Sequence, residues 1–282
     1  MIIVKLWGGL GNQMFQYADG RHLSLKNKTS LVLDLSRLTK TEPVSYTKRD
    51  FELDVFNIRY KKKIYTDQLS YAARTYRKLF TKTVHENGNQ FNPDVLSQKG
   101  NVVLNGFWQT EKYFSDIGDI IRQDFTFKQT PDAANSKLLD EIKGTNSVSV
   151  HFRRGDYINN PVTAEVHETC SPAYYQTAMD LVGQKVKDTH FFVFSDEIEW
   201  VRKNVEITGK HTFVDVNKGV KSAGDMRLMA ACKSNIIANS SFSWWGAWLN
   251  PNPNKIIIAP KKWFKDTAVA INDLIPPNWI TL

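Results

Sequence analysis

The C-terminal half of the chain alternates short apolar runs with stretches of helical periodicity, and no other feature constrains the fold as strongly. The apolar runs are residues 148–152, 191–194, 212–216, 236–238 and 256–259. Most of them are separated by predicted helices at 171–181, 198–205, 224–231 and 243–249. Short apolar runs fit strands buried on both faces, and their alternation with helices is typical of a doubly wound parallel sheet. The sequence therefore predicts an α/β fold.

The N-terminus predicts a second unit of the same kind. Residues 2–6 form a short apolar run, a glycine-rich segment at 8–11 interrupts it, a helical apolar face starts after Asn12, and a new apolar run covers 31–35. This order of elements is a β-α-β unit, in which the two strands are parallel.

The length of the chain, 282 residues, exceeds what one compact core usually absorbs and predicts two lobes. Pro131 fits the first position of a helix, and Gly144 marks its end. We therefore expect an N-terminal lobe at 1–144 and a C-terminal Rossmann-like lobe at 145–282. The remaining elements predicted for the first lobe are a helix at 71–80 and a strand at 101–104.

Polar residues follow several of the predicted strands at the point where each strand ends. They are His151 with Arg153 and Arg154, Ser195 with Asp196, Asp215, and the run Asn239-Ser240-Ser241. Ligands of open α/β sheets bind beyond the carboxyl ends of the strands. We therefore expect these four groups to converge on one binding site.

The segment His151-Phe152-Arg153-Arg154-Gly155-Asp156-Tyr157 carries the strongest chemical signal. Guanidinium groups match phosphate oxygens bidentately and stay charged at any working pH. Asp156 could hold one arginine in place, and Gly155 allows a sharp turn. The alternative interpretation is a surface salt bridge between Arg154 and Asp156. The Arg-Gly-Asp triplet inside the segment is interpreted as a chance match to an adhesion tripeptide.

The glycine segment at residues 8–11 is weaker evidence. It does not match the dinucleotide fingerprint, because Met14 stands where the third small residue belongs. A glycine turn that opens a helix still presents backbone amides to an anion or a sugar hydroxyl, and Gly9, Gly11 and Asn12 are the candidates. A simple tight turn explains the pattern equally well.

The segment that starts at Asn239 follows a strand and opens a helix, so its hydroxyls and amides can bind a pyrophosphate oxygen. Capping of the helix by Ser241 or Ser243 is the structural alternative. Ser195 and Asp196 could bind a ribose or a base edge, or cap a helix in the same way. The three tryptophans Trp244, Trp245 and Trp248 are expected to lie in the core rather than to form a sugar platform.

The chain carries a formal net charge of +8, with a visible basic cluster of Arg59, Lys61, Lys62 and Lys63. A solvated surface explains this cluster, and contact with anionic lipid headgroups is the alternative. The two cysteines form no disulfide framework, and no signal peptide or membrane span is recognisable. We expect a cytoplasmic protein, peripheral to the inner face of the membrane if the cluster binds lipid.

Two absences narrow the chemistry. The sequence has no Asp-x-Asp triplet that would bind a metal ion through a diphosphate, and no Gly-x-Ser-x-Gly or His-Glu-x-x-His motif of the common hydrolases. Without a metal, the charge of a leaving group would be stabilised by Arg153, Arg154 and helix amides.

Three segments together resemble the α-1,2-fucosyltransferase family, glycosyltransferase family eleven. They are Gly-Gly-Leu-Gly-Asn-Gln-Met-Phe-Gln-Tyr-Ala at 8–18, the arginine segment at 151–157, and Asn-Ser-Ser-Phe-Ser-Trp-Trp-Gly-Ala-Trp-Leu at 239–249. They stand in the family's order, and the middle one is shared with a wider fucosyltransferase superfamily. The resemblance implies a GT-B architecture of two Rossmann-like lobes with a donor cleft between them, a GDP-fucose donor, inversion at the anomeric carbon and no metal cofactor. A bacterial member fits best.

The resemblance also implies roles for single residues. Arg153 would bind the diphosphate, His151 and Asp156 would organise that site, and Asp196 would face the nucleoside. Gly9, Gly11 and Asn12 would close the cleft from the acceptor-side lobe. The catalytic candidates are thus Arg153, Asp156 and His151, and the donor-binding candidates are His151, Arg153, Arg154, Ser195, Asp196, Asn239, Ser240, Ser241, Gly9, Gly11 and Asn12.

The expected partners are GDP-fucose and a glycan acceptor ending in a β-galactoside, without nucleic acid. Four residues near the arginine segment could act as general base, and none is favoured: Asp156, Glu165, His167 and Glu168. A different GDP-sugar donor on the same architecture is one alternative. A non-catalytic protein that binds glycans or nucleic acid is the other.

Overall fold

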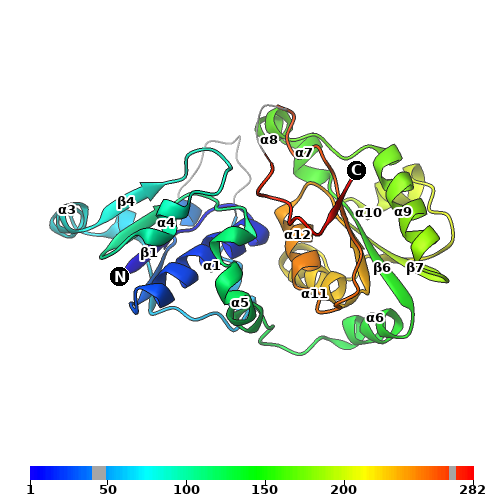
Figure 1. The fold of residues 1–282 in the computed structure, drawn as a ribbon, viewed down its shortest axis with the longest axis horizontal. Coiled ribbons are helices and arrows are strands. Elements are labelled where there is room, and N and C mark those ends of the chain that lie inside the picture. The colour runs from blue at the N-terminus through cyan, green and yellow to red at the C-terminus, as the bar shows by residue number, and fades with distance from the viewer. Residues whose placement is uncertain (40–48, 267–270) are drawn as a thin grey trace. The chain divides into compact units, whose positions relative to one another are not determined.

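The structure, a computed structural model, describes residues 1–39, 49–266 and 271–282, and these divide into two compact α/β units (Figure 1). Unit 1 holds the described residues 1–39, 49–129 and 271–276, and unit 2 holds 130–266 and 277–282. Each unit is built around its own parallel sheet, as the alternation of apolar runs and helices predicts.

Unit 1 has a five-stranded sheet in the order β3-β2-β1-β5-β4. Its strands are β1 (Ile2–Lys5), β2 (Leu31–Asp34), β3 (Lys62–Ile64), β4 (Lys82–His85) and β5 (Val102–Asn105). Its helices are α1 (Leu10–Lys26), α2 (Ser36–Thr39), α3 (Tyr71–Phe80), α4 (Pro93–Ser97) and α5 (Gly118–Asp124). The central strand β1 is buried on both faces over Ile2, Ile3 and Val4, which explains why these residues are apolar in succession.

Unit 2 has a six-stranded sheet in the order β11-β10-β9-β6-β7-β8. The strands are β6 (Asn146–Phe152), β7 (Thr189–Ser195), β8 (Lys210–Val214), β9 (Ser234–Ile236), β10 (Ile257–Ala259) and β11 (Ile280–Thr281). The helices are α6 (Ala133–Lys143), α7 (Gly155–Asn159), α8 (Pro161–Val166), α9 (Pro172–Lys185), α10 (Ile198–Asn204), α11 (Ala223–Ala231) and α12 (Ser241–Trp248).

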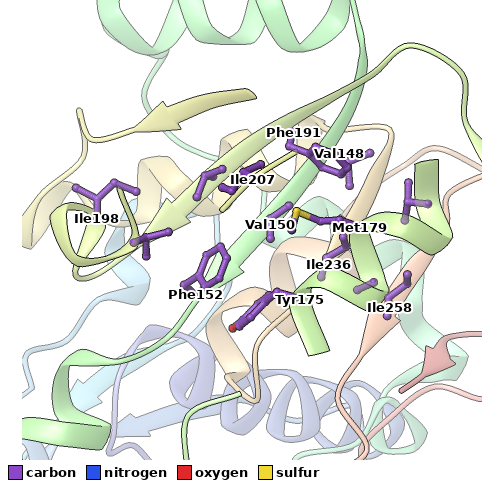
Figure 2. Packing of buried hydrophobic residues seen from close by; sticks show 14 residues of the cluster. Val148, Val150, Phe152, Tyr175, Met179, Phe191, Ile198, Ile207, Ile236 and Ile258 are labelled. Carbon is purple, nitrogen blue, oxygen red and sulfur yellow. The ribbon is translucent and has the colours of Figure 1, made fainter. Parts of the chain in front are cut away.

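The core of unit 2 follows the two-residue period of its strands. On β6, Val148, Val150 and Phe152 pack with Tyr175 and Met179 of α9 in one apolar cluster (Figure 2). The intervening side chains of β6, His151 among them, point to the opposite face of the sheet. The strand therefore delivers an imidazole to one face and an apolar layer to the other.

The boundary between the units lies at 129/130 rather than at the expected 144/145. Helix α6 packs against α11 and β6 and so belongs with unit 2. Pro131 is not the first helical residue, because Asp132 caps α6 by accepting the amide hydrogen of Asn135 at 2.9 Å. Near the C-terminus, residues 271–276 return to unit 1.

None of the helices in the described part of the chain combines the length and the apolarity that crossing a membrane requires.

Candidate functional site

The turn after β6 depends on Gly155, the first residue of α7. A Cβ atom on this residue would lie 2.7 Å from Oδ2 of Asp196, at the end of the neighbouring strand β7. No side chain fits there without displacing that carboxylate. Gly155 therefore lets the ends of β6 and β7 approach each other, and it brings the arginine segment to Asp196.

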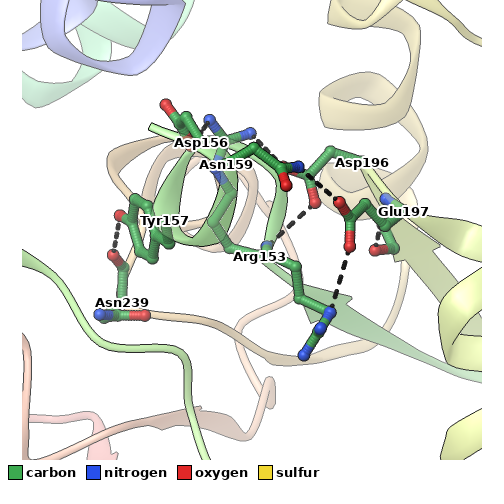
Figure 3. A network of polar contacts seen from close by, with 9 residues as sticks. Arg153, Asp156, Tyr157, Asn159, Asp196, Glu197 and Asn239 are labelled. Atoms are coloured by element: carbon green, nitrogen blue, oxygen red, sulfur yellow. Dashed lines mark hydrogen bonds and ion pairs between the residues drawn. The ribbon is translucent and has the colours of Figure 1, made fainter. Parts of the chain in front are cut away.

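Arg153 is the centre of the resulting polar network (Figure 3). Its Nη2 lies 2.6 Å from Oδ1 of Asp156, and its Nη1 lies 2.9 Å from Oδ2 of Asp196. Burial alone would lower the pKa of Arg153, but the charges of Asp196 and Asp156 outweigh burial and raise it. The guanidinium is therefore fixed in position and permanently charged, with further N–H groups left to donate.

Arg154 points elsewhere. Its Nε lies 3.3 Å from Oε2 of Glu197, and its guanidinium carbon lies 3.2 Å from the ring centroid of Trp200. Only its backbone amide joins the network, by donating to Oδ1 of Asp196 at 3.0 Å. The alternative bridge from Arg154 to Asp156 is wrong for this structure, since Asp156 bonds to Arg153.

The carboxylates around the two arginines outnumber them. Asp156, Asp196 and Glu197 face two guanidinium groups, so the local formal charge is negative by one. An anion that binds here needs additional donors, and backbone amides at a helix start can supply them.

The four strand-end groups do not all converge. Asp215, which follows β8, forms an ion pair of 3.0 Å with Arg202 of α10 rather than with Arg153. The hydroxyl of Ser195 accepts the amide hydrogen of Glu197 at 3.0 Å and so stabilises the turn into α10. This is the structural role that the sequence offered as the alternative to ligand binding. The structure therefore brings three of the four groups together and pairs Asp215 with Arg202 instead, and the role of the three groups in binding a ligand stays a prediction.

Asn239 joins the network through its backbone. Its carbonyl accepts the hydroxyl of Tyr157 at 2.7 Å (Figure 3). Its side-chain amide donates to the carbonyls of Glu168 at 2.9 Å and Trp263 at 3.0 Å. The side-chain amide of Asn239 thus holds two loops together.

Helix α12 begins at Ser241, directly after this loop. Ser240 occupies the N-cap position and makes no side-chain capping bond. Ser243 donates to the carbonyl of Ser240 at 3.3 Å, so it does not cap the helix either. The hydroxyls of Ser240 and Ser243 therefore accept no hydrogen bond from the backbone amides in the first turn of α12.

The tryptophans of α12 lie in the core, as expected. Trp244 and Trp245 are fully buried with ring centroids 5.1 Å apart. The ring of Trp279 lies 5.4 Å from that of Trp244. This indole cluster anchors the helix and fixes the direction of its N-terminus.

His151 is a neutral imidazole in a buried position, 4% exposed. Burial, together with the adjacent charge of Arg153, lowers its pKa to about 3. Its Nδ1 has no hydrogen-bond partner among the described residues. A histidine with this pKa does not exchange a proton near neutrality, so acid–base catalysis by His151 is disfavoured and a hydrogen-bonding role remains.

The candidates for the general base differ in their surroundings. Glu165 is exposed, and Glu168 pairs with Lys262 at 2.5 Å. His167 lies not on an open loop but against Tyr157, with ring centroids 4.6 Å apart, and burial lowers its pKa. Of these four residues, Asp156 is the one that forms an ion pair with Arg153.

The glycine segment of unit 1 follows the C-terminal end of β1. Gly8 has a φ of +79°, and a Cβ there would lie 2.6 Å from Nδ2 of Asn12, so this position requires glycine. Gly9 caps α1 through its carbonyl, which accepts the amide of Gln13 at 3.1 Å. Gly11 is buried within the first turn.

The polar residues of this segment hold unit 1 together. Oδ1 of Asn12 accepts from Nε2 of Gln109 at 2.7 Å, and Gln13 donates to the carbonyls of Gly8 and Asp50 at 2.9 and 2.8 Å. The role of Gly9, Gly11 and Asn12 toward a ligand stays a prediction.

Sequence reasoning missed three residues of the site: Tyr157, Glu197 and Trp200. Burial raises the pKa of the Tyr157 hydroxyl above its usual value, so it stays protonated and donates to Asn239. Glu197 and Trp200 hold the side chain of Arg154. Glu197 directly follows Asp196, so its acidity was visible in the sequence; nothing there indicated the partner.

A cavity of about 80 Å³ lies beside the network and is lined by Arg153, Arg154, Cys170 and Trp200 among others. This volume holds a few water molecules and is too small for a nucleotide. Among the residues that the structure describes, no three His, Cys, Asp or Glu side chains group in a way that could hold a metal ion.

Comparison with known proteins identifies the class. The crystal structure of the NodZ α-1,6-fucosyltransferase soaked with GDP-fucose, an enzyme known from Bradyrhizobium, superposes with a TM-score of 0.53 at 17% identity, over 89% of this chain and 92% of that chain. This likeness shows the fold, which is the GT-B type of glycosyltransferases.

Sequence relatives identify the family. The model of glycosyl transferase family 11 matches residues 1–282. An α-1,2-colitosyltransferase of Escherichia coli is 38% identical over 100% of this chain and 99% of its own length. The O-antigen biosynthesis glycosyltransferase WbnK of Escherichia coli is 33% identical over 98% and 99%. The chain therefore belongs to glycosyl transferase family 11.

Proposed function

We propose that this enzyme transfers L-fucose from GDP-fucose to the 2-hydroxyl of a terminal β-galactoside, with inversion at the anomeric carbon and without a metal cofactor. The observation that carries the proposal is the Arg153 guanidinium, which two carboxylates hold at 2.6 and 2.9 Å beyond the carboxyl end of β6. A charge fixed in this way before the reaction stabilises an anion without reorganisation.

In the proposed reaction the acceptor hydroxyl attacks the anomeric carbon from the face opposite the diphosphate, and its oxygen forms the new glycosidic bond while its proton passes to a basic side chain of the site or to water. The bond between that carbon and the phosphate oxygen breaks, and the negative charge of the departing GDP grows. Arg153 would donate to this oxygen, and the amides at the start of α12 would add to the same stabilisation. Asp156 and Asp196 act by keeping the guanidinium in place.

His151 fits a role in donor binding. Its imidazole is neutral and buried, and Nδ1 has no partner among the described residues. A buried polar atom without a partner is unfavourable unless a ligand or a water molecule satisfies it. We propose that the nucleotide supplies this hydrogen bond.

A second donor is favoured by a specific observation. The relative that is 38% identical over the whole chain is a colitosyltransferase. Colitose lacks the 3-hydroxyl of fucose, so the two donors share the diphosphate and the nucleoside and differ at one sugar position. The Arg153 site would bind either donor, and the choice between them would depend on contacts to that hydroxyl.

The test is a donor panel of GDP-fucose, GDP-colitose and GDP-mannose, each with a β-galactoside acceptor and with release of GDP as readout. We expect the highest kcat/KM with GDP-fucose, a 1,2-linkage by NMR, and unchanged rates in EDTA. A higher kcat/KM with GDP-colitose would show that colitose, not fucose, is the sugar transferred. Loss of activity in EDTA would refute metal independence. Absence of transfer from every GDP-sugar would refute the proposal.

A further inference from the structure

Helix α3 of unit 1 exposes every one of its described side chains. Four large apolar residues are among them: Tyr71, Tyr76, Leu79 and Phe80 are 80%, 65%, 74% and 57% exposed. They make up half of the large hydrophobic residues that are exposed in the described part of the chain. Tyr76, Leu79 and Phe80 lie on one side of the helix, and Tyr71 lies on the other. Exposed apolar side chains that gather on one face of a folded protein mark an interaction site.

The helix is amphipathic. At 100° per residue, Ala72, Ala73, Tyr76, Leu79 and Phe80 share one face. The rings of Tyr76 and Phe80 are in contact, tilted by 37° with centroids 4.4 Å apart. Its start is fixed by a proper cap, since Ser70 accepts the amide hydrogen of Ala73 at 3.3 Å.

The opposite face is basic, with Arg74 and Lys78, and Lys82 follows at the start of β4. The charge is strongly biased around the helix as well. Residues 59–82 contain a single acidic residue, Asp67, and eight basic ones: Arg59, Lys61, Lys62, Lys63, Arg74, Arg77, Lys78 and Lys82.

We propose that α3 binds an anionic lipid surface, with its apolar face in the interface and with Arg74, Lys78 and Lys82 against the headgroups. A short helix with aromatic and leucine residues on one face and Lys or Arg on the other is the pattern of interfacial helices. Pairing with a second copy of this chain through α3 is disfavoured, because it would bring like charges together.

The position of α3 in unit 1 agrees with this role. The helix leads into the N-terminal end of β4, whereas the glycine segment follows the C-terminal end of β1 (Figure 1). All neighbouring strands in this sheet are parallel, so the two features lie at opposite ends of the strands. A lipid surface on α3 would leave the glycine segment uncovered.

The structure also separates α3 from the basic cluster that the sequence suggested. Lys62 and Lys63 lie in β3, at one edge of the sheet, and β4 forms the other edge. Lys63 is engaged, because its Nζ lies 2.5 Å from Oδ2 of Asp54. The cluster at β3 therefore serves as an internal control for non-specific attraction by positive charge.

The test is co-sedimentation with phosphatidylcholine vesicles that do or do not contain phosphatidylglycerol. Three double variants are compared: Leu79→Ser with Phe80→Ser, Arg74→Glu with Lys78→Glu, and the control Lys61→Glu with Lys62→Glu. We expect binding of the wild type to anionic vesicles, about tenfold weaker binding for each α3 pair, and less than about threefold change for the control. The α3 side chains are exposed, so thermal unfolding should be unchanged.

Equal binding to neutral and anionic vesicles, or no sedimentation with either, would overturn the proposal. An equal loss in the control would show that charge alone attracts the protein. A concentration-dependent dimer in light scattering that disappears with Leu79→Ser and Phe80→Ser would assign α3 to self-association instead. These measurements require no transferase activity and stand apart from the proposed reaction.

Discussion

The two units are built alike, around parallel sheets, but they treat charge at the ends of their strands differently. In unit 2, arginines and carboxylates pair with one another, as Arg153 does with Asp196 at 2.9 Å. In unit 1, Glu86 follows β4, and its two oxygens accept the backbone amides of Phe107 and Trp108 at 2.6 and 2.7 Å. At these two strand ends, unit 2 stabilises a carboxylate with a permanent cation and unit 1 does so with backbone dipoles, although unit 1 forms ion pairs elsewhere, as between Arg21 and Asp124 at 2.8 Å.

Unit 1 also contains a carboxyl group, that of Asp19 in α1, with neither a cation nor a backbone amide bound to it among the described residues. This carboxyl is completely buried, and neither of its oxygens has a partner among the described residues. Burial raises its pKa well above the usual value, and the nearby charge of Glu86 adds to the shift. The charge of unit 1 at this point therefore depends on pH, whereas the guanidinium of unit 2 is charged at any working pH.

The largest expected effect is on Arg153. Arg153→Ala removes the fixed cation, and we expect kcat to fall by about 10²–10³-fold with the fold retained. Arg154→Ala is the matched control, because its guanidinium binds Glu197 and Trp200, and we expect less than about a tenfold loss. Steady-state rates with a GDP-sugar measure both losses. Equal losses for the two variants would show that Arg153 and Arg154 do not differ in their role.

The next effect concerns the pH dependence of stability. A buried acid with a raised pKa binds its proton more tightly in the folded state, so the free energy of unfolding falls as pH rises above the pKa of the unfolded chain. One such proton contributes at most about 1.4 kcal/mol per pH unit. Asp19→Asn should remove this part of the slope at pH values above the pKa of the unfolded chain, as measured by urea unfolding. A variant that keeps the slope of the wild type would contradict the assignment.

A smaller effect is expected at Glu86. Glu86→Gln replaces one acceptor oxygen by an amino group that faces a backbone N–H, and we expect a loss of about 1–3 kcal/mol. The exposed Glu165→Gln in unit 2 is the control, with a change below about 0.5 kcal/mol. Equal urea midpoints for both variants would show that the backbone amides do not depend on the carboxylate.

The smallest effect is expected where unit 2 pairs its charges in the open. Arg202 and Asp215 form an ion pair of 3.0 Å with both side chains more than a third exposed. Arg202→Ala should cost less than about 1 kcal/mol and leave turnover unchanged. Thermal unfolding measures the change in stability, and steady-state kinetics measure turnover. A loss of turnover close to that of Arg153→Ala would show that the Arg202–Asp215 pair belongs to the functional site.

The sequence predicted the elements whose signals are local and regular, but it did not predict the short strands β3, β4 and β11. The periodicity of 71–80 matches α3 at both ends, and the apolar runs of unit 2 all became strands, although β8 and β9 end two residues earlier than expected. The nine residues 40–48 that follow α2 lie outside the described part of the chain.

The partners of the site residues could not be predicted in the same way. Arg153 and Arg154 are adjacent and suggested a pair, but successive side chains leaving a strand point to opposite sides. The side chain of Arg154 pairs with Glu197, 43 residues further along the chain, because β6 and β7 are neighbours in the sheet. The exposure of α3 was equally hidden, because a helical period shows which residues share a face and not whether anything covers that face.

The indole cluster of α12 gives unit 2 an optical label of its own. Rings as close as those of Trp244, Trp245 and Trp279 exchange excitation energy, which produces coupled bands in circular dichroism. In unit 1, the ring of Trp7 contacts Phe107 and the ring of Trp108 contacts Tyr113, so neither contact joins two indoles. The melting of unit 2 can therefore be followed spectroscopically, separately from unit 1, without attaching a dye.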